Sequence, residues 1–268
     1  MKVAYPYQTE ETAQHLLSAK GKSKHIIPTL SAIGYDGIEL LVREPNIADL
    51  DAVYKVMQGN DLQVAALSTG PMVADDELSF TARDRSKREE AIRRVIELIV
   101  WAERFDTVVT IGKVRGQLLE DESYSWELMR TAFDQVLIEA DKRNVQLVIE
   151  PQNETHMNNL NGTYETIDYI HTFARSSLGV MLDLVHVEAE QTCRTVTECF
   201  RFANELLRFV HLSDSNRLVP GEGSFDVPSV LNTLQQIDYS GFISLEIKQQ
   251  GDSLDTAKRA IEYLRSIQ

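Results

Sequence analysis

The feature that most constrains the fold is an alternation of short apolar runs with longer amphipathic segments along the 268 residues. Eight runs are rich in Val, Ile, Leu and Tyr. Several are continuously apolar, as parallel strands buried on both faces require. The expected strands are 3–7, 37–42, 63–68, 107–112, 145–150, 178–184, 209–213 and 242–247.

The intervening segments have helical periodicity, clearest in 84–105, 126–140 and 253–267. The first unit is ambiguous, because its helix could span 10–20, 26–33 or both in succession. Eight strands alternating with helices predict an α/β protein with a single (β/α)8, or TIM, barrel over residues 1–268. The competitor is a doubly wound open sheet, but no GxGxxG follows the first expected strand.

Charge and hydropathy limit the partners of the chain. There are 27 Lys and Arg against 41 Asp and Glu, a net charge of −14, which opposes nucleic-acid binding. The amino terminus has no apolar leader, and no stretch approaches the roughly 18 apolar residues of a membrane span. We therefore expect a cytoplasmic protein with no nucleic-acid or membrane partner. A small anionic substrate remains compatible with one or two local Arg residues.

Metal-capable side chains stand at the ends of the last four expected strands: Glu150, Asp183, His211 and Glu246. Barrel active sites lie at the carboxyl ends of the strands, so these side chains should converge. Each residue alone is more often a cap, an ion-pair partner or a packed core residue, but the set on four adjacent strands favours ligation. A divalent cation would offset both the cost of burying the carboxylates and their mutual repulsion. The donor set suits Mn²⁺ or Mg²⁺, with Co²⁺ or Zn²⁺ as alternatives.

Six segments between about residues 34 and 248 carry a resemblance to a known family: GYDGIELLVREPNI, TIGKVRG, VIEPQNETH, MLDLVH, HLSDSNRLVPGEGSFD and LEIK. With them the chain resembles the xylose-isomerase-like barrel superfamily of sugar isomerases and epimerases. The resemblance is greatest to ketose 3-epimerases of the D-tagatose 3-epimerase and 5-keto-L-gluconate epimerase type. It implies an enzyme that acts on a small-molecule sugar and forms a homodimer or homotetramer.

The resemblance also implies residue roles. The four strand-end residues would hold the metal, and Glu150 and Glu246 would be the catalytic pair. His186 and Arg217 would hold substrate oxygens, although His186 could instead contact a metal-ligating side chain and fix its position. The family's usual EPLNRYE reads EPQNETH here, so Glu154 stands where Arg is expected and His156 where a substrate-contacting Glu is expected. This departure leaves the metal set intact and affects the substrate end, where we place His156.

The implied reaction is epimerisation of a ketose or keto-sugar acid at the carbon next to the carbonyl. Glu150 and Glu246 come from strands three apart, so at roughly 4.8 Å per strand they should flank the metal. One would remove a proton and the other would return one to the opposite face, through a metal-stabilised cis-enediolate. Lys113 and Arg115, after the fourth strand, could bind a substrate carboxylate or phosphate or could form a solvated basic turn.

Three other functions fit parts of the pattern. An aldose–ketose isomerase of the hydroxypyruvate or xylose type would use the same metal site. A non-catalytic sugar-binding barrel would bind ligand without turnover. A nuclease of the apurinic-site type is disfavoured, since it needs more His ligands than this chain's strand ends offer and the net charge is −14.

Overall fold

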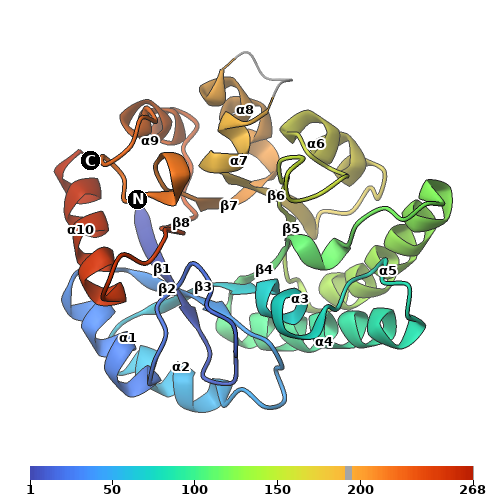
Figure 1. Ribbon diagram of the computed structural model, residues 1–268, viewed down its shortest axis with the longest axis horizontal. Coiled ribbons are helices and arrows are strands. Elements are labelled where there is room, and N and C mark those ends of the chain that lie inside the picture. The colour runs from blue at the N-terminus through green and yellow to red at the C-terminus, as the bar shows by residue number, and fades with distance from the viewer. Residues whose placement is uncertain (191–194, 268) are drawn as a thin grey trace.

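The computed structural model describes residues 1–190 and 195–267, and its eight parallel strands close into a barrel (Figure 1). Each strand pairs with the next along the chain, and the last returns to the first, which confirms the predicted (β/α)8 barrel. All eight expected runs overlap a strand. The strands are β1 (Lys2–Gln8), β2 (Gly37–Leu41), β3 (Gln63–Ser68), β4 (Val108–Ile111), β5 (Leu147–Ile149), β6 (Leu178–Asp183), β7 (Leu207–His211) and β8 (Phe242–Ser244).

The longer helices form an outer ring around the strands (Figure 1). The helices are α1 (Ser23–Ala32), α2 (Leu50–Gln58), α3 (Gly70–Asp76), α4 (Arg85–Phe105), α5 (Glu122–Arg143), α6 (Thr163–His171), α7 (Leu184–Glu188), α8 (Val196–Ala203), α9 (Val227–Gln236) and α10 (Ser253–Ser266). Short 3₁₀ turns are η1 (Lys113–Arg115), η2 (Asn204–Leu206) and η3 (Ser215–Arg217). The three clearest predicted helices correspond to α4, α5 and α10. Within the described ranges, no helix has the length and apolar character needed to cross a bilayer.

Helix α4 illustrates how the outer ring is held. It begins at an N-cap, Asp84, whose carboxylate accepts the N–H of Ser86 at 2.8 Å. Its inner stripe buries Val95, Leu98 and Ile99 completely. Burial of side chains of this size stabilises the fold by about 1.5–3 kcal/mol each. Truncation of Leu98 to Ala would therefore cost roughly 2–5 kcal/mol.

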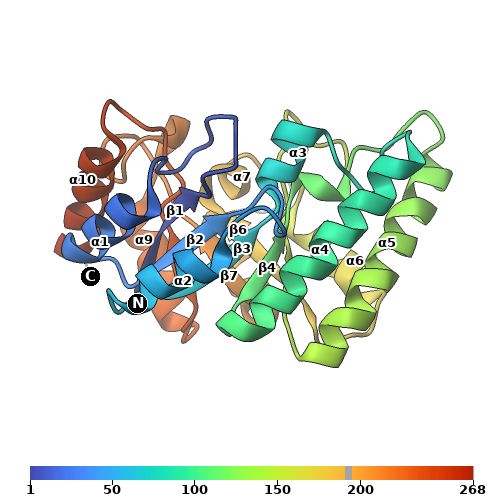
Figure 2. The same ribbon diagram turned by 90° about the horizontal axis from the view of Figure 1, so that it is seen from below.

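The first unit resolves one alternative that the sequence left open. Helix α1 corresponds to the 26–33 alternative, whereas residues 10–20 form no helix. Residues 9–22 instead form the β1–α1 loop, which lies at the same end of the barrel as α3 and α7 (Figure 2). Asp75 in α3 accepts the backbone N–H groups of Ala13 and Gln14 at 2.8 and 3.0 Å. The loop is thus attached to α3 at the carboxyl end of the barrel.

An apolar cluster on the strands lies beneath this end. It is formed by Ala4, Ala65, Ala66, Val148, Met181 and Phe209. Because side chains on a strand alternate between faces, Val148, Met181 and Phe209 share a face with residues two positions later. Those later residues are the predicted ligands Glu150, Asp183 and His211. These side chains therefore lie directly above the apolar cluster, toward the carboxyl end of the barrel.

Candidate active site

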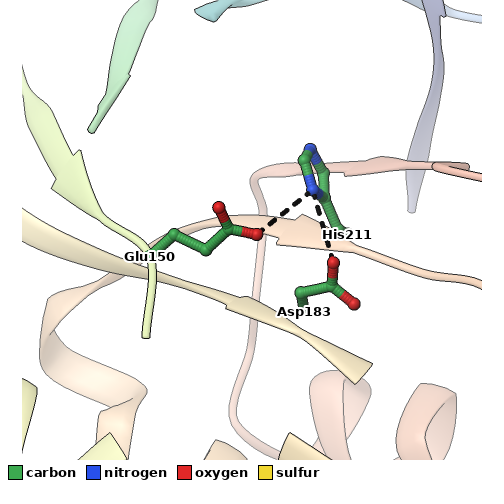
Figure 3. A group of neighbouring side chains, drawn as sticks. All are labelled: Glu150, Asp183 and His211. Atoms are coloured by element: carbon green, nitrogen blue, oxygen red, sulfur yellow. Dashed lines mark ion pairs between the residues drawn. The ribbon is translucent and has the colours of Figure 1, made fainter. Parts of the chain in front are cut away.

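Glu150, Asp183 and His211 lie together where β5, β6 and β7 end (Figure 3). All three are buried, and one ligand atom from each lies within 4.8 Å of the others. Nδ1 of His211 is 3.7 Å from Oε1 of Glu150 and 3.7 Å from Oδ2 of Asp183. The structure therefore brings together three of the four predicted ligands.

Glu246, the fourth predicted ligand, lies beside this group but outside it. It follows β8, and its Oε2 is 3.5 Å from Nδ1 of His211. The same oxygen is 2.7 Å from Nη1 of Arg217. The side chain of Glu246 is 22% exposed, so this carboxylate is more open to solvent than those of Glu150 and Asp183.

The atoms around His211 fit a divalent cation. Nδ1 of His211 is buried and has no hydrogen-bond partner within the described part of the chain. Two ligand atoms that each lie about 2.1 Å from one cation are about 3.0–4.2 Å apart, depending on the angle between them. The distances of 3.5–3.7 Å from Nδ1 to three carboxylate oxygens fall in this range. Carboxylate oxygens with one imidazole suit a hard cation.

Glu39 on β2 is a buried carboxylate of this site that the sequence analysis missed. Its oxygens lie 3.1 and 3.0 Å from Nε2 of His211. Ser68 and Ser244 donate hydroxyl hydrogen bonds to it at 2.5 and 2.6 Å. Burial disfavours its charge, but the charge and hydrogen bond of His211 and the two hydroxyls hold the pKa of Glu39 below its usual value. A lone acidic residue inside the apolar run GIELL was the available signal.

The carboxylates also determine the charge of His211 and its neighbour. Burial disfavours the protonated ring, yet Glu39 and Glu246 hold the pKa of His211 well above its usual value. Burial likewise disfavours ionised Asp183, but the charge of Arg217 holds the pKa of that carboxyl far below its usual range. Oδ1 of Asp183 accepts the N–H of Val185 as the N-cap of α7, which leaves Oδ2 facing the site.

Arg217 and His186 approach the group from the 3₁₀ turn η3 and from helix α7. Arg217 has φ +62°, a left-handed conformation that is uncommon outside glycine, and its Nη1 is 2.5 Å from Oδ2 of Asp183. His186 is buried in α7, with Nε2 3.5 Å from Nη2 of Arg217 and 4.0 Å from Oε1 of Glu150. These two of the five predicted substrate-binding residues thus lie next to the candidate ligands.

His156 lies at the exposed rim of the same region. Its ring packs edge-on against that of His186, with centroids 5.3 Å apart. Nδ1 of His156 is 2.9 Å from Oδ1 of Asn153. Partial burial and the positive charges of Lys113, His186 and Arg217 lower the pKa of His156. The neutral ring is therefore favoured.

Lys113 and Arg115, for which the sequence analysis offered the same two roles, have different environments. Lys113 is exposed and lines the cavity beside the carboxylates. Arg115 is completely buried and is not among the lining residues. Its guanidinium donates to the carbonyl oxygens of Gly112 and Glu150 and to Asn159. The expectation that Arg115 binds substrate is therefore corrected, because its donors hold the backbone around Glu150.

A cavity of about 320 Å³ opens beside the candidate ligands. Its polar wall includes Glu150, Gln152, His211 and Glu246, and its apolar wall includes Leu16, Leu17, Val73 and Ala74. Gln152 donates from Nε2 to Oε2 of Glu150.

Gly112, also in the lining, permits this close packing. A Cβ there would lie 2.8 Å from Oε2 of Glu150 and 3.2 Å from Nε2 of Gln152. No pattern in the sequence singles out Gln152 or Gly112, because their importance arises only from this contact.

Comparison with known proteins agrees with the resemblance seen in the sequence. Residues 27–267 match the xylose isomerase-like TIM barrel family. An L-ribulose 3-epimerase from Methylomonas sp. (strain DH-1) is 26% identical over 254 residues, which are 91% of this chain and 86% of that protein. A D-psicose 3-epimerase from Enterocloster bolteae is 33% identical over 107 residues, 40% of this chain and 35% of that protein.

A solved structure gives the same fold. D-psicose 3-epimerase from Clostridium cellulolyticum H10, crystallised with D-tagatose, superposes with a TM-score of 0.79 at 19% sequence identity. The superposition covers 100% of this chain and 99% of that chain. The chain therefore belongs to the xylose isomerase-like TIM barrel family and is distantly related to the ketose 3-epimerases.

Proposed function

We propose that this protein is a divalent-metal-dependent epimerase of a ketose or keto-sugar acid, and that it inverts the carbon next to the carbonyl. The observation that carries the proposal is the buried Nδ1 of His211, which makes no hydrogen bond to any described residue and faces oxygens of Glu150, Asp183 and Glu246 at 3.5–3.7 Å. The named activities of the related 3-epimerases support the same reaction class.

In this proposal Glu150, Asp183, His211 and Glu246 hold the cation. Mn²⁺ is our first choice, with Mg²⁺, Co²⁺ or Zn²⁺ as alternatives, because the donors are mostly carboxylate oxygens. When bound, the cation would polarise the substrate carbonyl and offset the negative charge that develops on its oxygen. Arg217 already contributes positive charge at Asp183 and Glu246, at 2.5 and 2.7 Å.

The proton transfers are assigned to Glu150 and Glu246. One carboxylate removes the proton from the carbon next to the carbonyl, and the other carboxyl group delivers a proton to the opposite face of that carbon. The reverse reaction exchanges the roles. Gln152 contributes by donating to Oε2 of Glu150, which restrains the rotation of this carboxylate.

Substrate oxygens are assigned to His186 and Arg217, with His156 and Lys113 nearer the rim. Nε2 of His186 lies 4.0 Å from Glu150, so a group bound there would be close to the proposed base. The cavity of about 320 Å³ is at the small end of the range for small-molecule pockets, which supports a monosaccharide rather than a longer sugar chain.

Incubation with Mn²⁺ and a panel of ketoses and keto-sugar acids in deuterated water tests the proposal. We expect deuterium at the carbon next to the carbonyl, together with inversion of that carbon, and loss of both after chelation. Formation of an aldose would favour an aldose–ketose isomerase. Binding of sugar without deuterium exchange in the presence of any of the four metals would favour a sugar-binding barrel and contradict the proposal.

A further inference from the structure

We propose that Glu39 is a positioning residue, which fixes the ring orientation and tautomer of His211 so that Nδ1 is available to the cation. The inference rests on the proposed metal-dependent function and adds a residue from β2 to a site otherwise built from β5 to β8. Glu39 lines the same cavity, and its side chain is only 2% exposed.

The contact between the two residues defines which nitrogen carries the proton. Nε2 of His211 lies 3.1 Å from Oε1 and 3.0 Å from Oε2 of Glu39. An ionised carboxylate can only accept, so Nε2 must donate. A cation binds only the deprotonated, neutral ring, because the protonated ring has no free lone pair. In that neutral ring the lone pair is on Nδ1, the atom that faces the three carboxylates at 3.5–3.7 Å.

Glu39 is itself held from two other strands. Ser68 on β3 donates to Oε1 at 2.5 Å, and Ser244 on β8 donates to Oε2 at 2.6 Å. Thr110 on β4 in turn donates to Oγ of Ser68 at 3.0 Å. The carboxylate therefore cannot rotate without losing hydrogen bonds inside a buried site, where an unmade bond is costly.

Partners of this kind are known to matter for metal binding. A carboxylate that accepts the second N–H of a ligating imidazole orients the ring and makes it a better ligand, and its loss typically weakens metal binding by about 10–100-fold. A purely structural role for Glu39 would predict something different. In that case loss of Glu39 would lower the stability of the protein and leave the affinity of the correctly folded protein for Mn²⁺ unchanged.

The test is the affinity of the full-length protein for Mn²⁺ alone, measured by electron paramagnetic resonance of free Mn²⁺ at fixed pH and ionic strength. We expect Glu39→Gln to bind Mn²⁺ about 10–100-fold more weakly. Glu44→Gln is the matched control. Glu44 is another buried carboxylate near the end of β2, paired with Arg93 and Arg94 outside the cavity, and its variant should bind Mn²⁺ as the wild type does.

A second variant separates positioning from charge. The double change Ser68→Ala and Ser244→Ala keeps the charge of Glu39 but removes both hydroxyl donors that hold it. We expect Mn²⁺ binding about 3–10-fold weaker than in the wild type, a smaller loss than with Glu39→Gln. This variant also decides the question if Glu39→Gln fails to fold.

Three outcomes would overturn the inference: unchanged affinity in Glu39→Gln, an equal loss in Glu44→Gln, or wild-type affinity in the double serine variant. The last result would mean that the charge of Glu39 acts without its fixed position. Failure of the proposed function is distinguishable, because the wild type would then bind no Mn²⁺ or would bind it without sugar turnover.

Discussion

Nη1 of Arg217 lies 2.7 Å from Oε2 of Glu246, an oxygen that also faces Nδ1 of His211 at 3.5 Å. The same guanidinium nitrogen is 2.5 Å from Oδ2 of Asp183. A side-chain cation and the proposed divalent cation therefore share two carboxylates. Arg217 lowers the repulsion between the carboxylates of Asp183 and Glu246, and it also competes with the divalent cation for the oxygens of these carboxylates.

Arg217→Gln tests this competition. We expect Mn²⁺ affinity to stay the same or to rise, because a positive charge next to the ligands is removed. The KM for the sugar should rise at least about tenfold, the effect of losing one charged hydrogen bond to a substrate oxygen. Titration with Mn²⁺ and steady-state kinetics measure the two effects. Arg259→Gln on α10 is the control, and a tenfold loss of Mn²⁺ affinity with Arg217→Gln would contradict competition.

Glu246→Gln tests the proton-transfer role. Loss of one general acid or base typically costs about 10²–10⁴-fold in rate, so we expect kcat and deuterium exchange to fall by that factor. Circular dichroism should show an intact fold, because Glu246 is partly exposed. The exposed Glu262→Gln on α10 is the control. Exchange at the wild-type rate in Glu246→Gln would refute the scheme with two glutamates.

Gly112→Ala tests the close packing of the polar wall. The added methyl would lie 2.8 Å from Oε2 of Glu150, so this carboxylate must move. We expect at least about a tenfold loss of kcat/KM, since a misplacement of about 1 Å can cost about a hundredfold. Gly70→Ala is a matched control in the same cavity, because no atom lies within 4 Å of the added Cβ. Equal activities in the two variants would count against a fixed position for Glu150.

Arg115→Lys tests the structural role that replaced the predicted substrate contact. Burial lowers the pKa of Arg115 to about 10, and its guanidinium donates to several oxygens that a single ammonium cannot all reach. We expect the free energy of unfolding in urea to fall by about 2–4 kcal/mol. Lys113→Gln should leave stability unchanged. A stable Arg115→Lys variant with a raised KM would restore the substrate role.

Asp76 on α3 gives a prediction for acid stability. A hydrogen bond from Arg43 chiefly lowers the pKa of this carboxyl to about 2, against the effect of partial burial and with help from Arg94. Because the folded pKa is below the unfolded value of 3.8, the contribution is present above pH 3.8 and is lost as the pH falls toward 2. After allowance for partial exposure we expect about 1–2 kcal/mol.

Urea unfolding at pH 6 and pH 3 measures this contribution. Asp76→Asn should be less stable than the wild type at pH 6 and should lose less stability between the two pH values. Asp134→Asn is a control at an exposed ion pair on α5. Parallel losses of stability in the wild type and Asp76→Asn would show that Asp76 is not the group responsible.

The sequence predicted the barrel and the proximity of three candidate ligands for a clear physical reason. Buried parallel strands need continuous apolar runs, and the polar residues that end such runs must share one end of the barrel. Glu150, Asp183 and His211 follow this rule directly. Because each apolar run is separated from the next by an amphipathic segment, all eight strands could be predicted from the sequence.

The role of Glu39 at the site and the burial of Arg115 could not be predicted in this way, for two different reasons. Glu39 lies inside an apolar run, and only the closed barrel brings it next to His211, 172 residues away. Arg115 sits in a Gly-flanked basic turn that looks exposed in sequence, yet Asn159 and backbone carbonyls enclose it. Residues 10–20 have the composition of a helix, but contacts with Asp75 hold part of them as a loop.

The cavity's apolar wall comes from Leu16, Leu17, Val73 and Ala74, all within the first third of the chain, whereas the candidate ligands lie in its second half. The two walls are therefore supplied by separate segments of the chain. Exchange of the β1–α1 loop would therefore change the apolar lining of the cavity while Glu150, Asp183 and His211 keep their places.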